Sequence, residues 1–238
     1  MSQPPSDVLA FAAVLLIGYP VADYFVVEKV KRSAQPRKGF YAWVLGSEWL
    51  LTIALIGLLS RHGVTLSDLG EAIGRPIVTV TFIVAGVILV AVLATYNRKQ
   101  IAQLSPERLS KVLLRAGPLV PRSGVERGLL VLVALTAGFC EEVLYRGWLW
   151  RFFGDLTGKV WIAVVLSAIA FGLGHAYQGR AGIISTGIVG LLFSVPVLLT
   201  KSLVPVQIMH AGFDLVNGLV LSKAAEPVAV ARAQQSSY

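Results

Sequence analysis

Long apolar runs separated by short polar segments dominate the chain. A window of about 20 residues finds seven runs that are candidates to cross a membrane. The candidate spans are 8–27, 42–60, 76–96, 128–150, 160–176, 182–200 and 204–222. Their apolar residues are continuous and do not alternate with a period of two, which is typical of helices rather than of a barrel. The pattern therefore predicts an all-α fold, a polytopic membrane helical bundle with about seven transmembrane helices.

The polar segments divide this bundle into three parts. Residues 1–127 are expected to hold N-terminal transmembrane helices and basic loops, residues 128–222 a helical core, and residues 223–238 a disordered tail. The connector at 98–127 contains PERLSKVLLRAG, a pattern typical of an amphipathic surface helix. The first seven residues lack the basic region and cleavage site of a signal peptide, so the first apolar run is expected to stay as a span.

Composition and charge agree with a membrane protein. The chain is 55% hydrophobic and 14% charged, whereas a soluble domain is usually about 25% charged. The net charge of +8 does not indicate nucleic acid binding, because the basic residues lie between apolar runs rather than on one surface. The single cysteine, Cys140, excludes an internal disulfide.

The basic residues also predict an orientation. Loop 27–38 has five Lys or Arg residues and connector 98–127 has seven, whereas loop 61–75 has two. The positive-inside rule therefore places both basic segments and the C-terminus in the cytoplasm and the N-terminus outside.

Charged and polar residues interrupt three of the late spans. A charge at the bilayer centre costs at least about 2.5–3.5 kcal/mol, so a group of them requires an explanation. The fourth span carries Glu141, Glu142 and Arg146, the fifth ends with Phe171 and His175, and the seventh carries His210 and Asp214. Burying these groups together is cheaper than exposing any of them to lipid.

Helical spacing separates their candidate roles. Glu142 and Arg146 are four residues apart on one face, so an ion pair that pins helices is their simplest role. Glu141 is rotated by about 100° and has no cation on its own face. A carboxylate in an apolar site can serve as a general base near neutral pH. His210 and Asp214 also share a face, where an interhelical hydrogen-bond clamp is an alternative to catalysis.

In this order, EEVLYR, FGLGH and HAGFD resemble the three motifs of the CPBP (CAAX protease and bacteriocin-processing) family. The resemblance covers roughly residues 128–222 and implies an intramembrane glutamic endopeptidase that needs no metal or other cofactor. Its implied catalytic residues are Glu141 and His175, which would activate water, and His210 and Asp214, which would stabilise the oxyanion; Glu142, Arg146 and Phe171 would support the site.

The resemblance also implies partners and a location. The expected substrate is a membrane-associated peptide or protein, cleaved near its C-terminus or leader, and the other partner is the lipid bilayer of a bacterial inner membrane. The oligomeric state stays open.

Asp214 departs from the asparagine of many relatives: an ionised aspartate cannot donate to an oxyanion, so it is either protonated or orients His210. Charge bias places Glu141 midway or somewhat toward the external face, which fits a relative that processes exported peptides.

Three alternatives remain open from the residues alone. A zinc-dependent hydrolase would use Glu141, His175 and His210 as ligands, although the chain has no HExxH motif. A transpeptidase or sorting enzyme would use Cys140 as its nucleophile. A transporter with a proton-coupled carboxylate would need no peptide cleavage at all.

Overall fold

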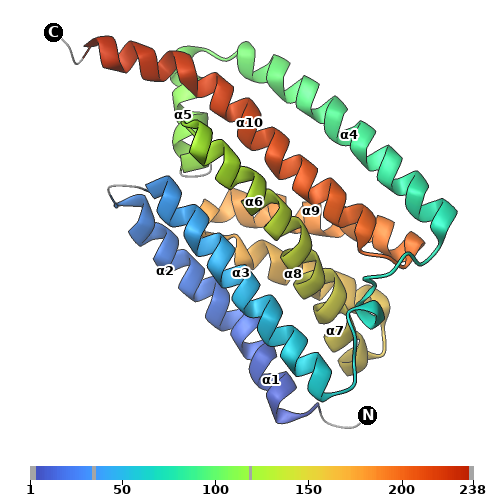
Figure 1. The fold of residues 1–238 in the computed structure, drawn as a ribbon. Coiled ribbons are helices and arrows are strands. Elements are labelled where there is room, and N and C mark those ends of the chain that lie inside the picture. The colour runs from blue at the N-terminus through green and yellow to red at the C-terminus, as the bar shows by residue number, and fades with distance from the viewer. Residues whose placement is uncertain (1–3, 34–35, 118–119, 236–238) are drawn as a thin grey trace.

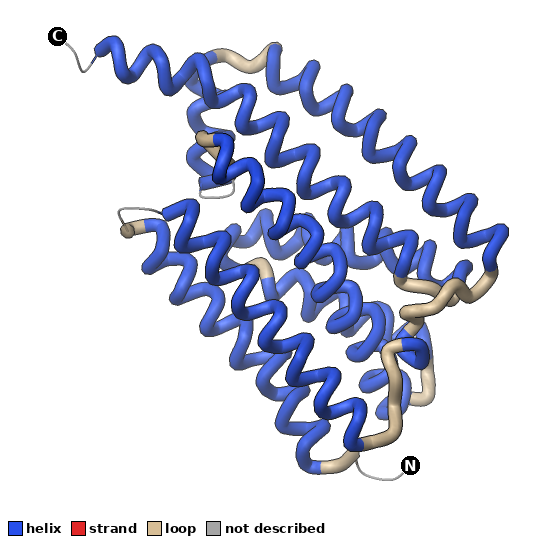
Figure 2. Tube along the Cα trace, viewed as in Figure 1, coloured by secondary structure: helices blue, strands red, loops and turns tan. Residues whose placement is uncertain are grey.

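The computed structural model describes residues 4–33, 36–117 and 120–235, and within these ranges all regular structure is helical (Figure 1, Figure 2). The α-helices are α1 (Ser6–Ala13), α2 (Tyr19–Lys31), α3 (Pro36–Arg61), α4 (Pro76–Ala102), α5 (Pro106–Ala116), α6 (Gly124–Glu141), α7 (Leu149–Thr157), α8 (Val160–Gly174), α9 (Gly179–Thr200) and α10 (Val204–Gln235). Short π-helical segments join α1 to α2 (η1, Val14–Gly18) and α6 to α7 (η4, Glu142–Trp148), and short 3₁₀ turns are η2 (Ser67–Leu69) and η5 (Ala176–Gln178). The predicted all-α fold is confirmed.

Six helical segments of the described chain are long and apolar enough to cross a membrane. They are Ser6–Lys31, Pro36–Arg61, Pro76–Ala102, Gly124–Thr157, Ala176–Thr200 and Val204–Glu226. The remaining predicted span, 160–176, corresponds to α8, which has only 15 residues. At 1.5 Å per residue α8 is about 22 Å long, shorter than the roughly 30 Å hydrocarbon core of a bilayer. The helix is therefore present as predicted but ends within the depth of the bundle.

The helices form a bundle with the candidate motifs at its centre. In Figure 1, α1, α2 and α3 lie along one side, α4 and α10 lie together along the other, and α6, α8 and α9 lie between them. Many large apolar side chains on α4 and α9 point outward, including Ile77 and Leu192. An outward apolar surface of this kind is stable in lipid, so the structure is that of an integral multi-pass membrane protein.

Of the two polar segments with a predicted structure, one is confirmed and one is wrong. The connector helix is confirmed as α5, whose first turn is capped by Ser105, since the hydroxyl accepts from the backbone N–H of Arg108. The segment expected to be a disordered tail from residue 223 is instead helical to Gln235, because α10 continues without a break; residues 236–238 lie outside the described part of the chain.

Two glycines permit the close helix contacts that assemble the site. A Cβ on Gly138 of α6 would clash with the backbone of α10 at the carbonyl of Gln207. A Cβ on Gly172 of α8 would clash with the carbonyl of Ile183 in α9. Close backbone approach at small residues is the usual basis of helix packing in membranes, where no hydrophobic force drives helices together. Gly138 and Gly172 therefore permit the close approach of α6 to α10 and of α8 to α9.

Candidate active site

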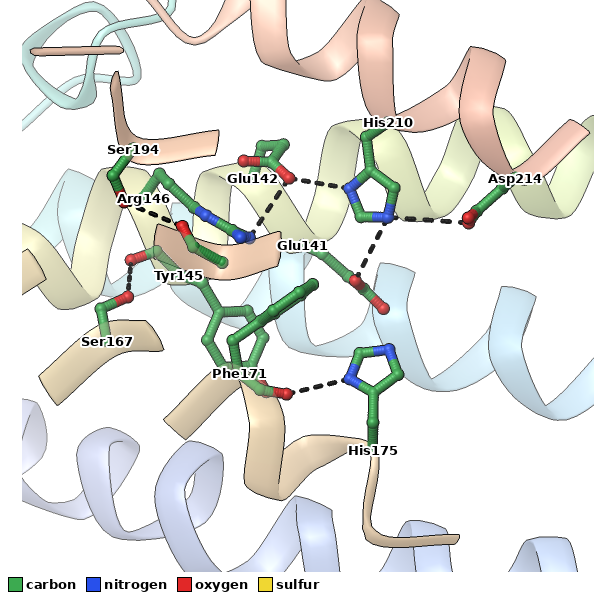
Figure 3. A network of polar contacts seen from close by, with 11 residues as sticks. Glu141, Glu142, Tyr145, Arg146, Ser167, Phe171, His175, Ser194, His210 and Asp214 are labelled. Atoms are coloured by element: carbon green, nitrogen blue, oxygen red, sulfur yellow. Dashed lines mark hydrogen bonds and ion pairs between the residues drawn. The ribbon is translucent and has the colours of Figure 1, made fainter. Parts of the chain in front are cut away.

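The polar residues of the three motifs meet in the interior of the bundle. Glu141 ends α6, Glu142 and Arg146 lie in the π-helical segment η4, His175 follows α8, and His210 and Asp214 project from α10. Figure 3 shows these side chains converging from the three helices. The sequence predicted an ordinary α-helix through the first motif, whereas η4 is wound more loosely. Single π turns within helices occur frequently at functional sites.

The wider turn of η4 is held by a neighbouring helix. The backbone carbonyl of Tyr145 accepts a hydrogen bond of 2.5 Å from the Ser167 hydroxyl of α8. Both groups are buried, and a buried carbonyl without a partner would be costly. Ser167 therefore stabilises the segment that carries Glu142 and Arg146.

Glu142 links the first and third motifs. Its Oε1 lies 3.2 Å from Nη1 of Arg146 and 2.7 Å from Nδ1 of His210. All three side chains are buried, and the guanidinium of Arg146 also lies 4.0 Å from the centre of the Phe171 ring. Buried charges are tolerated when they are paired and hydrogen-bonded. The predicted ion pair is present, and it is extended to His210 on another helix.

This contact determines which nitrogen of His210 faces the cavity. A carboxylate accepts only, so the hydrogen between Glu142 and Nδ1 belongs to His210. The other nitrogen, Nε2, then points toward Glu141 and Asp214, whose Oε2 and Oδ2 atoms are 3.7 Å and 3.6 Å away. Asp214 therefore lies on the exposed side of the ring, and the residue that orients His210 is Glu142.

His175 is positioned by the end of α8. Its Nδ1 lies 2.9 Å from the backbone carbonyl of Phe171, one turn earlier. Because a carbonyl only accepts, Nδ1 donates, and the side chain satisfies one of the carbonyls that a helix end leaves free. The ring packs against those of Phe171 and Tyr177, with centroids 4.9 Å and 6.0 Å away. The early end of α8 thus places Nε2 of His175 opposite Glu141 (Figure 3).

A cavity of about 370 Å³ joins these groups. Its polar lining includes Glu141, His175, His210 and Asp214, while apolar side chains from α3, α6, α9 and α10 form most of the wall. The cavity extends to Ala116 at the end of α5 and to Leu221 of α10. This is the end of the bundle where both basic segments lie, since α2 ends there, α6 begins there and α5 leads into α6 (Figure 1). The cavity thus runs toward the basic end, whereas the charge bias alone placed Glu141 nearer the opposite face.

Two acidic residues of the N-terminal helices were missed by the motif analysis. Glu48 of α3 is 2% exposed and lines the same cavity as Glu141. Asp23 of α2 is also buried and accepts a hydrogen bond of 2.7 Å from the indole of Trp43. Their signal in the sequence was a lone carboxylate inside an apolar run, but neither belongs to a recognised motif.

The alternative centres fit the geometry less well. Cys140 is fully buried, and it is not among the described residues that line the cavity. A nucleophilic thiol must be accessible to its substrate. For the zinc alternative, residues 4–33, 36–117 and 120–235 contain no group of three or more His, Cys, Asp or Glu side chains arranged to hold a metal ion.

One family of known proteins matches the segment that carries the three motifs. Residues 125–216 match the family described as Rce1-like, type II CAAX prenyl endopeptidase Rce1-like. No curated protein and no solved structure matches the chain. The matched segment contains all three motifs and excludes the N-terminal helices. The match confirms the resemblance carried by those motifs.

Proposed function

We propose that this protein is an intramembrane endopeptidase of the glutamic type. The observation that supports it most strongly is that Glu141, His175, His210 and Asp214 come from three separate helices yet line one cavity. Peptide hydrolysis needs a base for water and a donor for the tetrahedral oxyanion, and a site shielded from bulk water strengthens both effects. The family match supports the same class of reaction.

In the proposed mechanism a water molecule between Glu141 and His175 attacks the scissile carbonyl. Glu141 takes the proton of the water, and the new C–O bond forms as the carbonyl π electrons move onto oxygen. His210, as the imidazolium, donates to this oxyanion from Nε2 while its Nδ1–H donates to Glu142. When the tetrahedral intermediate collapses, the C–N bond breaks and the proton held by Glu141 passes to the leaving amine. Asp214, as a neutral acid, donates to the same oxyanion.

The position of the cavity favours substrates that reach it from the cytoplasm. The cavity extends toward the end of the bundle that carries the basic segments, and the positive-inside rule assigns this end to the cytoplasm. Its mostly apolar wall favours a membrane-associated peptide or protein over a soluble one. A bacterial inner membrane is the location we propose.

The experiment is a cleavage assay on the purified protein in lipid nanodiscs, with an internally quenched peptide that ends in a prenylated CAAX sequence as the probe. Glu141→Gln keeps the shape of the side chain but removes its basicity, and we expect the rate per folded molecule to fall by about 10²–10⁴. Glu71→Gln is the matched control, since Glu71 lies outside the cavity in contact with Gln207. Full activity of Glu141→Gln would exclude the glutamic mechanism. Peptide transport without cleavage would indicate a transporter.

A further inference from the structure

Glu48 lies at the catalytic cavity without belonging to any of the three motifs. It projects from the middle of α3, is 2% exposed and shares the cavity lining with Glu141. The proposed mechanism does not use it. A carboxyl group buried this deeply is expensive unless it is neutral or paired with a charge.

The side chains of Glu48 and Glu141 line the same cavity, and their carboxyl groups interact with each other. On each of them Oε2 is buried without a hydrogen-bond donor among the described residues. Two carboxylates have no hydrogen to share, so they would leave these oxygens unsatisfied and would also repel each other. One proton held between the two groups removes both costs, as it does in carboxyl pairs of other proteases.

The surroundings decide which residue holds that proton. The titratable groups that interact electrostatically with Glu48 come from α2, α6, η4 and α10. They are carboxyl groups, phenols and one thiol: Tyr19, Asp23, Cys140, Glu141, Tyr145 and Asp214. Among the described residues no lysine or arginine forms an ion pair with it. Glu141, in contrast, has Nε2 of His210 at 3.7 Å, and 14% of its side chain is exposed. The negative charge is therefore better placed on Glu141 and the proton on Glu48.

We propose that Glu48 is a positioning residue for Glu141: it stays protonated and donates a hydrogen bond that orients the Glu141 carboxylate and keeps it ionised. This inference rests on the proposed function, in which Glu141 is the base. The proton of Glu48 is not consumed, because the proton taken from water moves from Glu141 to the leaving amine. The N-terminal helices thus complete a site whose motifs all lie in the family-matched segment.

Two variants of Glu48 separate this role from a merely structural one. Glu48→Gln retains a neutral side chain that can donate to Glu141, whereas Glu48→Met has a similar size and cannot donate. With the prenylated peptide as the probe, we expect Glu48→Gln to keep most of its activity. For Glu48→Met we expect a loss of about 10- to 100-fold at neutral pH, the range for a hydrogen bond to a charged group. The loss should appear in kcat rather than in KM, because the donor orients the Glu141 carboxylate and does not bind the substrate.

Infrared spectroscopy of the purified protein gives a test that needs no substrate. A protonated carboxyl has its own C=O stretch, and we expect the intensity of this band to fall in Glu48→Gln and not in the control Glu71→Gln. An unchanged band would overturn the proposal. So would a Glu48→Met variant with the wild-type kcat, or a folded Glu48→Gln variant as inactive as Glu48→Met.

Glu141→Gln, measured in the same assay, distinguishes failure of this inference from failure of the proposed function. If Glu141→Gln is inactive while both Glu48 variants behave as wild type, Glu141 remains the base and only the role of Glu48 is wrong. If Glu141→Gln is fully active, the proposed function itself is wrong.

Discussion

His210 donates from Nδ1 to Oε1 of Glu142 across 2.7 Å, and this contact joins α10 to the first motif. The same carboxylate pairs with Arg146. One acidic side chain therefore neutralises a buried cation and also sets the direction in which the imidazole faces. The ion pair with Arg146 leads to a prediction for Glu142. The direction of the imidazole, whose Nε2 faces Asp214, leads to a prediction for Asp214.

Glu142→Gln is expected to lower the stability of the fold more than it lowers the cleavage rate per folded molecule. The amide can still accept from His210, but the positive charge of Arg146 loses its counter-ion in a buried place. Removing one partner of a buried pair costs about 3–5 kcal/mol, so we expect a lower folded yield and a lower Tm. The control is Asp155→Asn, which breaks an exposed pair with Arg151 at 3.9 Å and should cost about 0–1 kcal/mol. Equal Tm values for the two variants would contradict the structural role of Glu142.

Asp214→Asn is expected to keep substantial activity, with an altered pH–rate profile. Asp214 lies 3.6 Å from Nε2 of His210 on the side away from Glu142, so its role in our proposal is donation to the oxyanion. Asparagine can donate to the oxyanion and alanine cannot. We therefore expect Asp214→Ala to lose roughly 10²-fold or more, as for removal of an oxyanion donor. The measurement is a pH–rate curve for wild type and both variants. If the folded Asn and Ala variants are equally inactive, the negative charge is essential and Asp214 belongs with the basic machinery.

Activity is expected to survive both chelation and loss of the thiol. If Glu141 and His175 activate water directly, EDTA and phenanthroline should leave the rate unchanged. Cys140→Ser should also remain active, because the thiol lies outside the cavity lining. Inhibition by chelators that zinc reverses would favour the metal hydrolase, and an inactive but folded Cys140→Ser would favour the transpeptidase.

Gly172→Ala is expected to separate α8 from α9. The added methyl group would clash with the backbone carbonyl of Ile183, which cannot move without shifting α9. The displaced end of α8 carries His175, so we expect both Tm and cleavage rate to fall. Gly57→Ala in α3 is the control: no atom lies within 4 Å of the added Cβ, and alanine favours a helix over glycine by about 1 kcal/mol. Equal behaviour of the two variants would contradict the close packing.

Topology reporters should show that the cavity opens to the cytoplasm. A reporter inserted after Lys38 and one within α5 should both report the cytoplasm, whereas one near Ser67 should report the outside. The physical basis is the excess of Lys and Arg in the segments near Lys38 and α5. The opposite result would reverse the orientation and open the cavity to the external side.

The amino-acid sequence by itself determined the fold class and the members of the motif site. In hydrocarbon every backbone group must be satisfied within its own segment, so long apolar runs fold as helices whatever surrounds them. Charged residues are rare in membrane spans because they are costly in lipid, so Glu141, Glu142 and Arg146 were identifiable as candidate site residues from the sequence. Helix geometry also predicted the pair of Glu142 with Arg146, since both residues lie on one turn.

Only the tertiary structure decided how these groups work together. Three features depend on how separate helices pack. The early end of α8 places His175 in the interior, Glu142 rather than Asp214 orients His210, and Glu48 lines the same cavity as Glu141. Helix packing is decided by the small residues and buried polar groups that each surface presents to another, and hydrophobic periodicity within one span does not reveal its partner. For the same reason the direction of the cavity, toward Ala116 and Leu221, became visible only once the helices were assembled.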